Sequence, residues 1–62
     1  MKYSELEKKL IKAGCLLKRE GANHPQWYSP ITGKTFSTSR HKAEEVPSGT
    51  LKKISKDSGV KL

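Results

Sequence analysis

The chain has 62 residues, of which 32% are hydrophobic, and thirteen Lys and Arg against six Asp and Glu give it a formal net charge of +7. This length allows one small domain, expected over residues 1–62, whose core is thin because such a chain buries only about 60% of its unfolded surface. A single cysteine excludes an internal disulfide and argues against a small secreted scaffold. No apolar run approaches the length of a membrane span or a signal-peptide core, so we expect a cytoplasmic protein without a membrane partner.

The sign of the charge is informative about partners. Solubility alone needs a net charge of about 2–8 of either sign, whereas a pI near 9.8 is typical of a protein that binds a polyanion. We therefore favour a nucleic acid as the partner, and an acidic protein would explain the charge equally well. A mean hydropathy of −0.77 leans toward disorder, but the apolar residues are patterned and indicate a folded domain.

The first expected element is a helix over residues 4–13. Ser4 and Glu7 are spaced as a capping box, in which the Ser4 hydroxyl accepts from the N–H of Glu7 and the Glu7 carboxylate reaches back. The apolar residues that follow recur at helical spacing. Gly14 is a left-handed stop that ends the helix.

Three strands are expected next. Residues 15–20 alternate with a period of two, so that Cys15, Leu17 and Arg19 would share one face of a half-buried strand. After a turn at residues 21–23, a second strand is expected over residues 24–29 and, beyond a hairpin connection at residues 30–33, a third over residues 34–39.

A second helix follows a charged loop at residues 40–45. Pro47 fits the first turn of this helix, Leu51 and Ile54 form its buried stripe, and Gly59 ends it. The order is therefore helix, three antiparallel strands, helix. We expect an α+β fold with both helices on one face of the sheet and the other face open to solvent or to a ligand.

His24 is the residue most suited to chemistry. Histidine titrates near neutrality and can act as a general acid or base without large tuning, although a lone histidine beside a turn is also an ordinary surface residue. Trp27 and Tyr28 should point to opposite faces of their strand, with Trp27 in the core and Tyr28 available to stack on a base or to pack on a partner. Cys15 is interpreted as a small buried hydrophobic residue.

Basic residues on or next to the strands are candidates for contacting phosphate. They would make binding steeply dependent on salt, although solvated lysines on a small surface are an alternative interpretation. The candidates are Lys18, Arg19, Lys34 and Arg40, with His41 beside Arg40. One Cys and two separated His do not supply a metal site, so any catalysis is expected to be acid–base chemistry without a metal or a small-molecule cofactor.

Four short motifs follow one another along the chain. They are Gly21-Ala22-Asn23-His24-Pro25-Gln26-Trp27, then Pro30 with Gly33, then Ser39-Arg40-His41, then Pro47-Ser48-Gly49-Thr50-Leu51-Lys52-Lys53-Ile54. In this order and spacing they resemble the HicA-type mRNA interferase toxins, and the resemblance covers nearly the whole chain.

The resemblance implies a fold like that of double-stranded-RNA-binding domains, in the order α-β-β-β-α. It implies the toxin of a toxin–antitoxin pair, an endoribonuclease that cleaves mRNA, stops translation and is neutralised by a HicB-type antitoxin. His24 matches the position of the catalytic histidine of the family. Two other functions remain open from the residues alone, namely a non-catalytic RNA-binding module and a protein-interaction domain whose basic surface meets an acidic partner.

Overall fold

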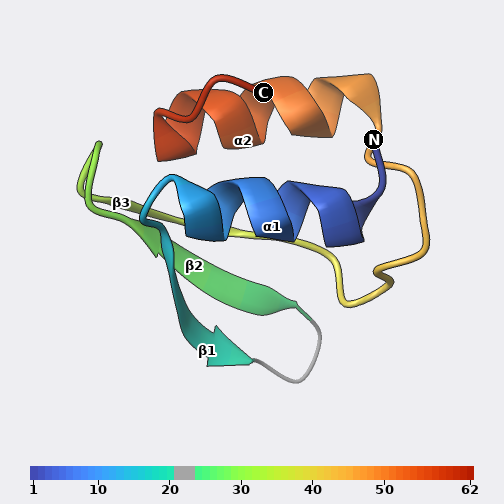
Figure 1. The fold of residues 1–62 in the computed structure, drawn as a ribbon, viewed down its shortest axis with the longest axis horizontal. Coiled ribbons are helices and arrows are strands. Elements are labelled where there is room, and N and C mark those ends of the chain that lie inside the picture. The colour runs from blue at the N-terminus through green and yellow to red at the C-terminus, as the bar shows by residue number, and fades with distance from the viewer. Residues whose placement is uncertain (21–23) are drawn as a thin grey trace.

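The structure, a computed structural model, describes residues 1–20 and 24–62. Its elements are α1 (Tyr3–Lys12), β1 (Leu16–Glu20), β2 (Pro25–Ser29), β3 (Lys34–Ser37) and α2 (Ser48–Ser58). The strands form one antiparallel sheet in the order β1-β2-β3. The expected order α-β-β-β-α is therefore confirmed, and the fold is of the α+β class and resembles a double-stranded-RNA-binding domain (Figure 1). The turn expected at residues 21–23 lies outside the described residues.

The core lies between the sheet and the two helices, which cover the same face of the sheet as expected (Figure 1). Alternate residues of β2 are buried against the helices, and Trp27 is only 2% exposed. The indole Nε1 of Trp27 donates a 3.1 Å hydrogen bond to Thr38 Oγ1, so its polar atom is satisfied inside the core. The buried hydrophobic residues are Tyr3, Leu6, Leu10, Cys15, Trp27, Phe36, Val46 and Ile54.

Helix α1 begins at Tyr3, and the capping box expected at Ser4 is wrong. No side chain caps this helix. Instead, the free N–H groups of Tyr3 and Ser4 donate to the backbone carbonyls of Glu44 and Lys42, at 3.1 and 3.0 Å. A distant loop thus replaces the local cap and satisfies the first turn.

The stop expected at Gly14 is confirmed. Gly14 has φ 97, its N–H donates to the Ile11 carbonyl at 3.0 Å, and the Cys15 N–H donates to the Leu10 carbonyl at 2.9 Å. This pair of bonds is a Schellman motif, which Gly accepts without the strain that a Cβ would bring. Cys15 and Leu10 are both buried beside it, so Cys15 is the small buried hydrophobic residue that was expected.

Strand β1 differs from expectation in two respects. All five of its residues are exposed, so the half-buried interpretation is wrong, because β1 is an edge strand beyond the part of the sheet that the helices cover. Its pairing also shifts from Leu17↔Trp27 to Arg19↔Gln26, which leaves Lys18 as the extra residue of a β-bulge. Leu17 and Arg19 therefore do not share a face, and Arg19 lies on the open face with Gln26.

The other two strands are shorter than expected. Strand β2 begins at Pro25, so His24 precedes it, and β3 ends at Ser37 instead of Ser39. One backbone hydrogen bond continues beyond β3, from the Thr38 N–H to the Pro25 carbonyl at 3.1 Å, and the Thr38 side chain lies on the core side with Trp27.

Helix α2 is anchored at its C-terminal end. Pro47 is its N-cap residue and lies just outside the first turn in which it was expected, while Gly59 ends the helix with φ 72 as expected. Thr32 Oγ1 donates to the Asp57 carbonyl at 2.5 Å, and Ser29 Oγ donates to the Ser58 carbonyl. Hydroxyl groups of the β2–β3 connection thus satisfy the last carbonyls of α2. No helix among residues 1–20 and 24–62 is long and apolar enough to cross a membrane.

Candidate functional site

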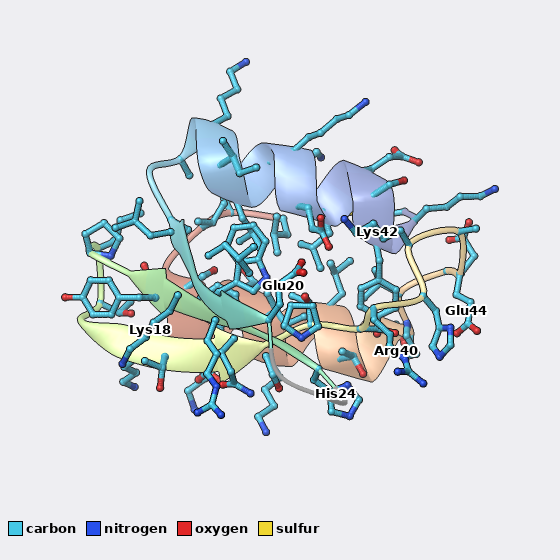
Figure 2. The ribbon with its side chains drawn as sticks, turned by 90° about the horizontal axis from the view of Figure 1, so that it is seen from below. Lys18, Glu20, His24, Arg40, Lys42 and Glu44 are labelled. Carbon is cyan, nitrogen blue, oxygen red and sulfur yellow. The ribbon has the colours of Figure 1, made fainter. Side chains whose placement is uncertain are left out.

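His24 lies directly before β2, is exposed, and borders a shallow hollow of about 170 Å³ at one end of the sheet (Figure 2). Three other parts of the fold complete this hollow: the start of α1, the end of β3 and the first turn of α2. The residues that line it with His24 are Tyr3, Ser37, Thr38, Ser39 and Thr50. We call it the His24 hollow.

The His24 hollow is rich in hydroxyl groups. All five residues that line it with His24 carry one, and none of them is charged near neutral pH. Hydroxyl groups can donate hydrogen bonds to phosphate oxygens while still accepting others. Thr50 lies in the first turn of α2 and lines the hollow, so the positive end of the dipole of α2 lies beside it. No acidic residue in that turn offsets this partial charge. The site therefore combines a histidine with a neutral, polar surface suited to an anionic ligand.

Arg40 and His41 follow the hollow directly in sequence. The N–H of His41 donates to Ser39 Oγ at 3.1 Å, which ties the backbone of this loop to the lining of the hollow. Neither side chain lines the hollow itself. Figure 2 places Arg40 at the same end of the molecule as His24, so the structure brings these two sequence-predicted residues to one end of the sheet.

Lys18 and Arg19 lie elsewhere. They border a separate hollow of about 330 Å³ on the open face of the sheet, together with Gln26 and Thr35. We call it the open-face hollow. Lys34 borders neither of these two hollows. It pairs with the buried Ser29 and so belongs to the helix-covered side of the sheet.

The hydroxyl residues of the His24 hollow were not identified from the sequence. The run of Ser and Thr at residues 37–39 is visible there, but it is equally typical of a strand with an exposed face. Tyr3 and Thr50 carry no local signal, because only the packing of both helices on the sheet brings them beside His24. Among the described residues, no group of three or more His, Cys, Asp or Glu side chains is placed to hold a metal ion.

Comparison with known proteins assigns the chain to a family. No curated protein and no solved structure matches it significantly. A family model described as the HicA toxin of bacterial toxin–antitoxin systems matches residues 3–60. This range contains every element of the fold and the complete lining of the His24 hollow. The chain therefore belongs to the HicA family and is the toxin of a toxin–antitoxin system, a class of toxins that act generally as ribonucleases and are paired with an antitoxin.

Proposed function

We propose that this toxin is a metal-independent endoribonuclease that cleaves mRNA with His24 as general base, stops translation in the cytoplasm and is neutralised by a HicB-type antitoxin. One observation carries the proposal. His24 is the one residue of the described lining whose side chain ordinarily titrates near neutrality, and hydroxyl groups surround it. Acid–base cleavage of RNA requires such a group beside a surface that accepts phosphate.

The reaction would involve only the RNA, the protein and solvent water, with no metal ion or small-molecule cofactor. The imidazole of His24 removes the proton of a ribose 2′-hydroxyl, and the 2′-oxygen attacks the adjacent phosphorus. The bond from phosphorus to the 5′-oxygen breaks, that oxygen takes up a proton from water, and the His24 imidazolium returns its proton to water. The products are a 2′,3′-cyclic phosphate and a 5′-hydroxyl.

Hydrogen-bond donors and cations would stabilise the negative charge that grows on the phosphate oxygens. The hydroxyls of Ser37 and Thr50 border the hollow and are placed to donate to these oxygens. Arg40 directly follows Ser39 of the lining, and we assign it, with His41 beside it, to the phosphate on this side. Lys18, Arg19 and Lys34 lie farther from His24, and we assign them to neighbouring phosphates of the RNA.

The test compares the wild type with His24→Ala, and with His41→Ala as a matched control. Induction of the wild type should arrest growth, and the purified protein should cleave a long RNA in EDTA. His24→Ala should lower the cleavage rate by about 10²–10⁴-fold, which is the usual contribution of a positioned general base, and it should abolish the growth arrest. His41→Ala, which removes a histidine assigned to phosphate contact and not to proton transfer, should lower the cleavage rate far less than His24→Ala does.

The chemistry of the new ends tests the mechanism separately. Fragments that end in a 3′-hydroxyl, or cleavage that stops in EDTA, would overturn it. RNA that is bound but stays intact with both the wild type and His24→Ala would identify a non-catalytic binding module instead.

A further inference from the structure

The open face of the sheet carries two rows of side chains that follow from the strand register. Tyr28 lies in the middle of one row, between Leu16 of β1 and Thr35 of β3. Gln26 lies in the middle of the other row, between Arg19 and Ser37. None of these six residues is acidic, and Gln26 and Tyr28 are half-buried, which holds them in place at the centre of the face.

The β-bulge determines the charge of this face. Without the extra residue at Lys18, strict alternation would place Arg19 on the same side as Leu17, which is the side of the sheet to which its partner Trp27 points. With the bulge, Arg19 joins Gln26 on the open face, and Lys18 borders the same hollow. Two cations therefore stand beside a tyrosine and an amide on a surface that no helix covers.

The open face is continuous with the His24 hollow. A third hollow, of about 440 Å³, lies along the edge of β3 and against α2. It shares Gln26 and Thr35 with the open-face hollow, and Ser37 and Thr50 with the His24 hollow. The three hollows therefore lie side by side, in a series that runs from Arg19, over the β3 edge, to His24, and we call this series the groove.

The middle of this groove carries one charge of each sign. Lys53 and Asp57 of α2 both line the third hollow, so its charge is balanced near neutral pH. The positively charged end of the groove lies at Lys18 and Arg19, and the end that carries the proposed general base lies at His24.

We infer that this groove, together with Tyr28 beside Thr35 on the open face, binds an unpaired strand of RNA, with a base stacked on Tyr28, a base edge bonded to Gln26 and a phosphate held by Arg19, so that a neighbouring phosphodiester reaches His24. The orientation toward His24 rests on the proposed function, but the binding of a single strand does not. Tyr28 of β2 and His24, which precedes β2, are four residues apart, and an extended chain of that length spans about 13 Å, which matches a short run of nucleotides.

The shape of the surface favours a single strand over a duplex. Bases in an RNA helix are stacked, and their edges lie in a deep, narrow major groove that side chains do not reach. A tyrosine ring and an amide on a shallow sheet face can contact bases only when these are splayed out. The known toxin family has an antitoxin partner as well, and an acidic protein on this face is the competing occupant that the experiment must distinguish.

Binding is best measured by fluorescence anisotropy with the His24→Ala protein and a labelled oligonucleotide in which every ribose is 2′-O-methylated, so that cleavage cannot occur. A single strand should bind more tightly than a duplex of equal length. Tyr28→Leu should weaken single-strand binding about tenfold, because one base would lose its stacking partner. Tyr28→Phe, which keeps the ring, should retain the affinity.

Arg19→Ala tests the phosphate contact through the effect of salt. Loss of one contact to a single strand should reduce the slope of log K against log salt by about 0.7. Lys8→Ala removes an exposed cation of α1, away from the groove, and should leave the slope unchanged. Circular dichroism of each variant checks that it remains folded.

The outcomes separate the two proposals. Equal affinity for duplex and single-stranded RNA, or an unchanged affinity of Tyr28→Leu for the single strand, would overturn the proposal that the groove binds a single strand. Variants that keep full RNA affinity but lose binding to the HicB-type antitoxin would assign the face to the protein partner and would also overturn it. If single-stranded RNA binds tightly and this binding depends on Tyr28, but the wild type does not cleave RNA, the groove proposal is supported and only the proposed function is contradicted.

Discussion

At the scale of single residues, the His24 hollow is supported from behind by the core. Thr38 lines the hollow and at the same time accepts the hydrogen bond of the Trp27 indole at 3.1 Å. Both residues are buried, with 2% of Trp27 and 4% of Thr38 exposed. The largest side chain of the core is thus tied by one bond to the wall of the candidate site.

Thr38→Val should destabilise the fold. The substitution keeps the shape but removes the acceptor, so the buried indole N–H would be left without a partner, at a cost of about 1–3 kcal/mol. Urea unfolding followed by tryptophan fluorescence measures this difference. Thr35→Val, on the exposed face of β3, is the control and should change the free energy of unfolding little. Equal effects of the two substitutions would contradict a special role for the Trp27–Thr38 bond.

A second prediction at this scale concerns pH. The N-terminal ammonium donates a 2.9 Å hydrogen bond to Glu45 Oε2, and this bond, with the attraction of the same charge, lowers the pKa of Glu45 below its ordinary value of 4.5. A carboxyl group whose pKa is lowered by folding stabilises the protein above its unfolded pKa, and this contribution is lost as the pH falls through the folded pKa. Wild type should therefore exceed Glu45→Gln in stability at pH 7, and the difference should disappear well below pH 4.5. Urea midpoints measured from pH 7 to pH 3 test this, and a constant difference would contradict it.

At the scale of elements, the C-terminal end of α2 and the β2–β3 connection form one structural unit. Gly59 ends the helix in the left-handed region, and a Cβ added to it would lie 2.8 Å from Ile31 Cγ2 and 2.9 Å from Thr32 Cγ2. The hairpin connection therefore lies directly against the helix end, where its hydroxyls satisfy the last carbonyls of α2. This contact sets how α2 lies along β3, and hence where Thr50 stands relative to His24.

Gly59→Ala should destabilise the protein more than Gly33→Ala does. Both positions have a positive φ, of 72 and 71, which costs a residue with a Cβ about 1–2 kcal/mol. Only at Gly59 does the added methyl also meet neighbouring atoms, since nothing lies within 4 Å at Gly33. Thermal unfolding of the two variants gives the comparison. Equal losses would mean that the exposed Ile31 side chain moves aside without cost.

At the scale of the whole molecule, the order of the elements was predictable because its signals are local. Gly14 and Gly59 mark the two helix ends, and the alternation around Trp27 identifies the central strand. Two features were not predictable because their causes are not local. The cap of α1 comes from a loop about forty residues away, and the bulge at Lys18 depends on how β1 pairs with β2. His24 was identified from its residue type and from the family resemblance, whereas its hydroxyl neighbours required the folded structure.

The walls of the His24 hollow come from widely separated parts of the chain, and this has a consequence for protein synthesis. Tyr3 of α1 and Thr50 of α2 border the same hollow. The end of α2 is held by hydrogen bonds that the hydroxyls of Ser29 and Thr32 donate to the backbone carbonyls of residues 57 and 58. A ribosome adds about 5–20 residues per second, so the four elements that precede α2 are synthesised before it. The nascent chain lacks one wall of the hollow throughout that time. Under the proposed function, we expect no cleavage of the message that is being translated until α2 has been made and has folded, and an antitoxin already present has this interval in which to bind the toxin.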